Sequence, residues 1–456
     1  MNKHTIKQAA MAAGALATIA MGVNVQAQSS DALLDKLVDK GILTVKEANE
    51  LKEESDKGFS QALQVKNGMP DWVSSFKING DFRGRYESFY SDSSYAPAAG
   101  PTEPFVDRHR FRYRLRLGFV ANMSDKFEVG MRLASGAYGT DPRLGADPIS
   151  TNQTLGNNGS KKSVFIDLAY AKWSPINTTE WSGAFTLGKM ENPFVFSDMV
   201  FDGDYTPEGL AQQFGYNLSD KQALKLNLGE FILTEIGGSN QDAYLGGAQL
   251  RLESNWSPKI HTSIGVSALA ITGSEGLFLA TGGSAVPDIN AGNTRNKGVL
   301  VNDYNPVVVD GSVTYNLSSF PGYAGVFPIK LGGDYMNNTA VGNENQAYSV
   351  GITFGKSGKK KTWDIGYRWK HLEADAWFEE VVDSDFGAFW GREPVSAKSG
   401  YYSGTNIQGH IVKASYSPYD QLTFGITYFV TELINNSPAN TKSDMGRLQL
   451  DALWKF

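Results

Sequence analysis

Residues 108–119 read RHRFRYRLRLGF, and arginine occupies every second position from Arg108 to Arg116. The residues between the arginines are mostly aromatic or aliphatic. Successive side chains of a β-strand point to opposite faces, whereas a helix would spread these arginines around its cylinder. The pattern therefore predicts a strand with one cationic face and one apolar face.

The same period of two recurs along the chain and predicts sixteen strands. Short turns such as NLSDK and SPYD alternate with long connections, for example at 137–162 and 374–403. This alternation is typical of an outer-membrane barrel. We therefore predict an all-β fold, a 16-stranded antiparallel transmembrane β-barrel over 74–456. The predicted strands are 76–90, 108–120, 127–136, 163–173, 184–192, 208–217, 222–233, 242–254, 259–272, 307–318, 329–338, 346–356, 362–373, 404–417, 421–433 and 445–456.

The N-terminal region differs from the rest. Residues 1–27 combine lysines, a run of small apolar residues and the sequence VQA, which predicts a secretory signal peptide cleaved after Ala27. Residues 28–73 are predicted to form a short periplasmic helical hairpin and a linker, with a capping box at Thr44 and Glu47. The hairpin is interpreted as an oligomerisation stalk, a peptidoglycan contact, a lumen plug or a solvated helical pair.

Composition excludes several classes of protein. The net charge of −6 argues against nucleic-acid binding, and the absence of cysteine excludes disulfides. The five histidines are scattered, with no H-x-x-x-H pair and no G-x-S-x-G elbow. We therefore expect no enzyme activity, no metal and no cofactor, although an outer-membrane enzyme is kept as an alternative.

The last predicted strand ends RLQLDALWKF, with Phe456 closing an apolar face. A terminal phenylalanine of this kind resembles the signal that the outer-membrane assembly machinery recognises. Several tryptophans also lie beside predicted short turns, where an aromatic girdle would meet the membrane surface.

The cationic faces are predicted to line the lumen, because an arginine at the bilayer midplane costs roughly 2–4 kcal/mol. A sixteen-stranded barrel is too wide for side chains to fill, so it leaves an aqueous channel. Such a wall would give mild anion preference. The alternative is that the arginines brace an inward-folded loop by ion pairing. The predicted pore-lining residues are Arg83, Arg85, Arg110, Arg112, Arg114, Arg116 and Arg132.

The connection after strand 184–192 is rich in acidic residues. Folded inward, it would oppose the arginines and constrict the pore; folded outward, it would be a solvated loop. Its spacing does not match an EF-hand calcium loop. A second connection, 374–403, is rich in aromatic residues that either pack together or form a binding track. The predicted constriction residues are Glu191, Asp198, Asp202, Asp204 and Glu208.

Four sequence features carry a resemblance to a known family: LLDKLVDKGILTVKEANELKEE, GKMENPF at 188–194, DGDYTPEGLA at 202–211 and the terminal Phe456. With these features the chain resembles the Gram-negative "putative porin" family. The resemblance implies passive diffusion of small hydrophilic solutes and ions across the outer membrane. The implied partners are membrane lipid and the assembly machinery, with no nucleic acid. A homo-oligomer such as a trimer, a substrate-specific channel and a closed structural or adhesive barrel remain open.

Overall fold

The computed structural model describes residues 69–91, 94–95, 103–104, 107–136, 149–235, 242–274, 277, 291–296, 299–387, 404–435 and 443–456. The predicted signal peptide at 1–27 lies outside the described residues. The same is true of the predicted helical hairpin within 28–73, of which only the last residues are described.

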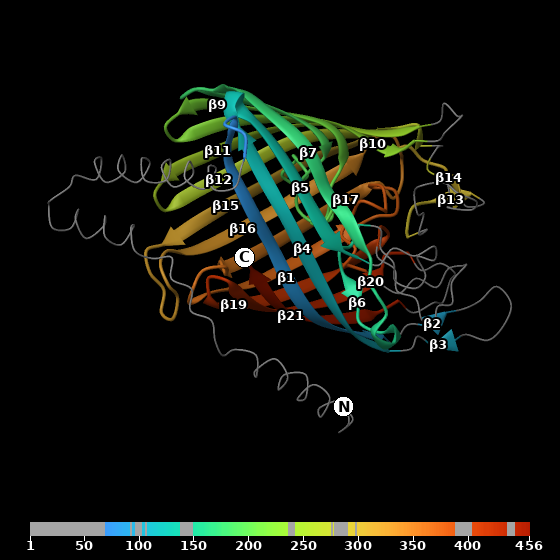
Figure 1. Cartoon of the computed structure of the whole chain (residues 1–456). Coiled ribbons are helices and arrows are strands. Elements are labelled where there is room, and N and C mark those ends of the chain that lie inside the picture. Colours follow the sequence, from blue (N-terminus) through green and yellow to red (C-terminus); the bar gives the residue numbers. More distant parts are fainter. Residues whose placement is uncertain are drawn as a thin grey trace. The chain divides into compact units, whose positions relative to one another are not determined.

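Sixteen long strands form one closed antiparallel sheet (Figure 1), and each overlaps a stretch predicted from the sequence. The strands are β1 (Val73–Ser91), β4 (Arg108–Met123), β5 (Phe127–Ser135), β7 (Val164–Asn177), β8 (Trp181–Lys189), β9 (Glu208–Ser219), β10 (Gln222–Thr234), β11 (Ala243–Ser257), β12 (Ile260–Thr272), β15 (Pro306–Leu317), β16 (Phe327–Asn338), β17 (Gln346–Gly355), β18 (Thr362–Leu372), β19 (Ile407–Tyr419), β20 (Leu422–Leu433) and β21 (Met445–Lys455).

The remaining elements of the described residues are short. β6 (Gln153–Thr154) adds to the main sheet beside β4, whereas β2 (Ser94–Tyr95) pairs with β3 (Glu103–Pro104) and β13 (Arg295–Asn296) with β14 (Val299–Leu300). Two 3₁₀ turns cover Ser124–Lys126 and Asn157–Gly159. No helix of the described part is long and apolar enough to cross a membrane.

The first and last long strands close the sheet. β1 and β21 pair in an unbroken antiparallel register from Asp81↔Lys455 to Ser91↔Met445. Phe456 continues this pairing, because its N–H donates to the Gly80 carbonyl and its carbonyl accepts from the Gly80 N–H. Closure gives the edge strands of the sheet their backbone partners, which is the condition for placing β-structure in hydrocarbon.

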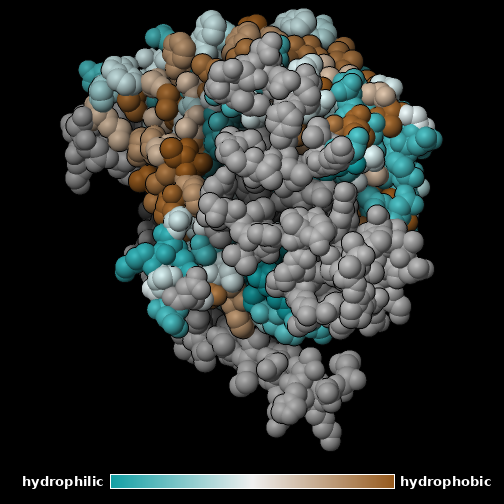
Figure 2. Space-filling view, turned by 90° about the vertical axis from the view of Figure 1, so that its right-hand side faces the viewer, coloured by the Kyte–Doolittle hydropathy of each residue, from teal (hydrophilic) through white to brown (hydrophobic). Residues whose placement is uncertain are grey.

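The outer face of the barrel is apolar and exposed. On β4, Phe111 is 52% exposed, and on β12, Ile264 is 57% exposed. Figure 2 shows hydrophobic side chains gathered over the upper wall of the barrel. At the short-turn ends of their strands, Phe127, Trp173 and Phe185 stack in a row with ring centroids 6.0 Å apart. A water-soluble protein rarely exposes apolar side chains so continuously, and a lipid-facing barrel must.

Strand β19 resolves an irregularity in the sequence. Apolar residues change from odd to even positions near Ile411, which suggests a bulge there. The structure instead keeps a regular register from Ile407 to Tyr416 and shifts only between Tyr416 and Tyr419. Ile407 and Ile411 are buried on the inner face, whereas Val412 and Tyr416 are exposed on the outer face. Both faces of this strand are apolar because its inner face packs against loops.

Two units are distinguished in the described chain. The smaller unit includes residues 69–76 and Ala121–Ser124. Within it the Ser74 hydroxyl donates to the Asn122 carbonyl at 3.0 Å, and the Asn122 amide donates to the Ser75 hydroxyl at 2.9 Å. The larger unit comprises Lys77–Val120 and Asp125–Phe456, and it contains all residues of the site described below.

Candidate channel interior

The connection 190–207 between β8 and β9, here called the crossing loop, runs through the interior of the barrel. Its Val195 N–H donates to Gln249 on β11 at 2.9 Å, and its Asp204 lies 3.4 Å from Arg114 on β4. The Ser197 hydroxyl donates to a carboxylate on β16. These strands are widely separated around the closed sheet, so a single loop reaches them only from inside. Of the two arrangements considered for this loop, the structure has the inward one.

A second segment, residues 373–387 after β18, packs against the crossing loop and is here called the packing segment. The Trp377 indole N–H donates to the Val200 carbonyl at 2.9 Å. Asp202 joins the two loops, because its carboxylate accepts from the Ser384 N–H at 2.8 Å. Two interlocked loops therefore lie inside the barrel at its long-loop side.

These loops carry the hydrophobic core of the described chain. Of the aromatic residues noted in the loop 374–403, Trp377, Phe378 and Phe386 are buried in this core, so they pack together. Phe389 and Trp390 lie outside the described residues. Apolar side chains on inner strand faces, such as Leu245 on β11, complete the core. The inner face is thus apolar at the loop side, where the loops cover it.

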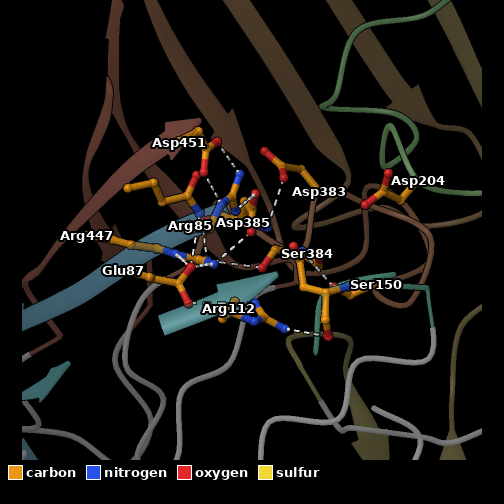
Figure 3. A network of polar contacts seen from close by, with 12 residues as sticks. Arg85, Glu87, Arg112, Ser150, Asp204, Asp383, Ser384, Asp385, Arg447 and Asp451 are labelled. Carbon is orange, nitrogen blue, oxygen red and sulfur yellow. Dashed lines mark hydrogen bonds and ion pairs between the residues drawn. The ribbon is translucent and has the colours of Figure 1, made fainter. Parts of the chain in front are cut away.

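The predicted arginines lie on inner strand faces, and most of them meet carboxylates. Glu87 on β1 has a side chain that is 0% exposed and is surrounded by three guanidinium groups, two of which, those of Arg112 and Arg447, are labelled in Figure 3. Arg110 donates to it, Arg112 lies 3.6 Å away, and Arg447 Nε donates at 2.9 Å. In this environment the carboxylate compensates buried positive charge.

Asp385, in the packing segment, connects that segment to the barrel wall. Its carboxylate lies 3.1 Å from Arg85 Nη1 and 2.7 Å from Arg447 Nη2, and Arg85 also pairs with Asp451 at 2.7 Å. Burial raises the pKa of the Asp385 carboxyl, but the charges of Arg447 and Arg85 outweigh it and hold that pKa well below its usual range. Figure 3 shows these side chains converging from β1, β21 and the loop.

Asp204 brings the crossing loop to the arginines of β4. Asp81 on β1 accepts from Arg114 and Arg116 at 2.9 and 2.7 Å, and Asp204 adds contacts of 3.4 and 3.7 Å to the same two groups. The predicted arginine wall and the predicted acidic loop therefore meet at this point.

Arg132 lies apart from these clusters, whereas Arg83 joins the Glu87 cluster through Asn152, whose backbone carbonyl accepts from Arg112 at 3.3 Å. Arg132 pairs with Asp167 on β7 and with Glu191 of the crossing loop. Arg83 donates to the Asn152 side chain at 2.6 Å. All seven predicted arginines thus lie on inner strand faces, but they form three separate groups of contacts.

The family comparison fits this geometry. Residues 93–272 match the family described as "Putative porin". The resemblance read from the sequence is confirmed over that range. No curated protein matches the chain.

The chain is similar to several solved structures. Pseudomonas putida OprB aligns with a TM-score of 0.50 and 10% identity, over 88% of this chain and 97% of that one. Salmonella typhi OmpF gives 0.44 at 9% identity, over 84% and 97%, and the channel DcaP of Acinetobacter baumannii gives 0.42 at 13%, over 84% and 97%. The family match and the barrel point to the bacterial outer membrane.

Within this porin-like interior, the other predicted loop acids do not face the arginines of β4. Asp198 lies 3.4 Å from Lys370 and 3.6 Å from Arg368, both on β18. Glu208 pairs with Lys189 at 3.0 Å on the neighbouring strand. The acidic rim predicted as one group is therefore divided among several partners.

The interior also contains charged residues that the sequence did not single out. Arg447 and Asp385 are the main examples, together with Lys370, which pairs with Asp383 at 2.8 Å. Alternation in RLQLDALWKF placed Arg447 on the inner face, and this was the available signal. Nothing in the sequence indicated that Asp385 would reach it. Among the described residues no cluster of side chains is suited to hold a metal ion.

Proposed function

We propose that this chain is an outer-membrane porin through which small hydrophilic solutes and ions diffuse passively. The proposal rests chiefly on one observation: a closed sixteen-stranded barrel with an apolar exposed outer face and a charged inner face. Lipid would cover the first face and water would hydrate the second. The match of residues 93–272 to porins supports the same function.

The finer proposal is that the channel prefers anions mildly. Arg83, Arg85, Arg110, Arg112, Arg114, Arg116 and Arg132 would line the pore, and Glu191, Asp198, Asp202, Asp204 and Glu208 would belong to its constriction. Because carboxylates such as Glu87 and Asp81 compensate several guanidinium groups, only part of the positive charge remains to attract anions.

The test is electrical. The purified full-length protein, inserted into planar bilayers, should give discrete conductance steps in KCl, and a salt gradient should give a reversal potential displaced toward chloride. The control is detergent taken through the same purification from cells that lack the protein. A folded barrel that gives no steps and no liposome swelling with small sugars would leave the closed structural barrel as the function.

A substrate-specific channel is the second candidate, and the interlocked loops favour it. Trp377 and Phe378 are buried between the crossing loop and the wall, so loop packing reduces the free cross-section. Liposome swelling with a graded series of sugars would distinguish the two candidates. In a general porin the permeation rates of the sugars follow their size alone, whereas in a specific channel one sugar permeates faster than its size predicts.

We also propose that Phe456 serves as the assembly signal. Its ring is 62% exposed at the end of β21, where a recognition partner could reach it. Deleting Phe456 should leave protein in the periplasm, and normal levels in the outer membrane would contradict this role. Cross-linking in the same membrane extracts measures whether the porin forms a trimer.

A further inference from the structure

The short-turn side of the interior holds a cavity of about 1000 Å³, here called the turn-side chamber. Its wall comes from β15 to β19, from β21 and from the turn after β17, and Asp198 of the crossing loop also borders it. Asp198 is its one acidic side chain among the described residues. Its cationic side chains are Lys330, Lys356, Lys359, Arg368, Lys413 and Lys455.

The five lysines differ from the arginines at the loop side because no carboxylate of the described part pairs with them. The neighbouring acids form their ion pairs and hydrogen bonds with other groups, although the charges of Asp198 and Asp310 also act on Lys413 and Lys330. Asp198 pairs with Arg368 and Lys370, and Asp364 accepts from the Ser357 N–H of the turn at 3.0 Å. Asp310 pairs with Arg251 at 2.6 Å. The chamber is therefore strongly positive within a chain whose net charge is −6.

Two features suit the chamber to a ligand. Lys413 lies along the wall over Gly366, where an added Cβ would stand 2.9 Å from its Cε, so glycine leaves room for the lysine stem. Lys330 stands between Thr314 and Thr353 of the adjoining strands, and both threonines also border the chamber. Ammonium groups and hydroxyls from separate strands thus surround one water-accessible space.

From this arrangement we propose that the turn-side chamber binds small oligovalent anions with adjacent phosphate groups, of which inorganic pyrophosphate is the simplest. A monovalent ion can pair with one lysine, and a single exposed pair of this kind contributes little to binding. An anion with several charges contacts several lysines at once, and the flexible ammonium groups act as point charges suited to phosphate. The role of the site in transport rests on the proposed function, but binding itself does not.

The first experiment measures binding directly. Isothermal titration calorimetry of pyrophosphate into the detergent-solubilised full-length barrel at low salt should give saturable binding, with orthophosphate clearly weaker. The double variant Lys330→Gln/Lys413→Gln should weaken pyrophosphate binding by about tenfold, from two lost ion pairs. The matched control is Lys225→Gln, since Lys225 pairs with Glu253 at 2.7 Å and does not line the chamber. Its affinity should equal that of the wild type.

Heat-modifiable mobility on gels reports whether each variant has formed the barrel. If the double variant does not fold, Lys359→Gln/Lys455→Gln replaces it, because both side chains are exposed and lie near the ends of strands. Absence of pyrophosphate binding to the folded wild type overturns the proposal. Equal affinity for orthophosphate, or equal loss in the Lys225→Gln control, overturns it as well.

A second experiment separates this inference from the proposed function. Pyrophosphate added on the short-turn side of single channels in KCl should reduce the current transiently, and the lysine double variant should remove the effect. A barrel that binds pyrophosphate in calorimetry but conducts no ions contradicts the proposed porin function and leaves the site standing. A barrel that conducts but does not bind pyrophosphate contradicts the site alone.

Discussion

The cationic side chains have different partners in the two halves of the barrel interior. At the loop side, Arg110, Arg112 and Arg447 converge on the buried Glu87, and Asp385 ties the packing segment to the wall. At the short-turn side, the lysines of the turn-side chamber form no ion pair with a carboxylate of the described residues. The first set of cations holds loops in place, whereas the second remains available to solutes.

The difference follows from what the loops supply. A guanidinium group forms planar, bidentate contacts, so arginine suits a fixed position between wall and loop. Lysine is a flexible, strongly hydrated point charge. Where a loop brings an acid, as with Asp204 and Asp385, the cation becomes structural. In the turn-side chamber the crossing loop brings only Asp198, which pairs with Arg368 and Lys370, so the five lysines form no ion pair there.

The largest effect is expected at Glu87. Glu87→Gln removes the charge shared by three guanidinium groups while its side chain is fully buried. Removing one partner of a buried ion pair costs about 3–5 kcal/mol. The free energy of unfolding in urea should fall by that amount. Glu253→Gln, which breaks the more exposed pair with Lys225, should cost about 1 kcal/mol or less. Equal losses in the free energy of unfolding would show that ion pairs contribute equally to stability in the two halves of the interior.

Asp385→Asn should release the packing segment without unfolding the barrel. Arg85 keeps Asp451 and Arg447 keeps Glu87, so the wall retains its pairs. Hydrogen bonds to charged groups contribute about 1.5–3 kcal/mol, and we expect local opening to become easier by a similar amount. Faster amide exchange in 373–387 and noisier single-channel current are the measurements. Unchanged exchange there would show that Trp377 packing alone fixes the segment.

The same contact predicts a pH dependence. Because the folded-state pKa of Asp385 lies well below its usual value, its stabilising contribution is present above the unfolded value, about 3.9. It is lost as the pH falls through the lowered folded value. Channel noise should therefore be constant from neutral pH to about pH 4 and should rise in stronger acid. The Asp385→Asn variant should be noisy throughout and should show no such acid transition.

A smaller effect is expected from the double variant Arg112→Ser/Arg114→Ser. Glu87 retains Arg110 and Arg447, and Asp81 retains Arg116, so no acid is left unpaired. The barrel should assemble, and the preference for anions should fall by about twofold as the lumen loses two charges. The reversal potential under a KCl gradient measures this. The double variant Arg112→Lys/Arg114→Lys preserves the charge and should leave the reversal potential unchanged. A double serine variant that fails to assemble would make these arginines structural.

Sequence reasoning predicted the barrel but only part of its interior. The alternation around Arg112 is local, so it determined both the strand and its inner face. The sequence did not decide whether the crossing loop folds inward, because an outward loop would leave Asp204 hydrated and equally stable. Asp385 was missed because it lies 62 residues from Arg447 in the sequence, and the inward fold of the packing segment brings the two together. Lys330, Lys413 and Lys455 were missed because each is a single charge on a different strand.

The smallest expected effect comes from Gly366→Ala, which tests how firmly a cation of the turn-side chamber is held. The new Cβ would stand 2.9 Å from Lys413 Cε and 3.2 Å from its Cγ. If the lysine is free, its stem rotates away, stability changes by less than about 1 kcal/mol, and pyrophosphate affinity falls by roughly twofold. Gly84→Ala is the control, because nothing lies within 4 Å of its added Cβ. A loss of stability like that expected for overpacking, about 1–3 kcal/mol, would mean that Lys413 is fixed. The cations of the two halves would then be held alike, and the distinction between bracing arginines and available lysines would fail at this position.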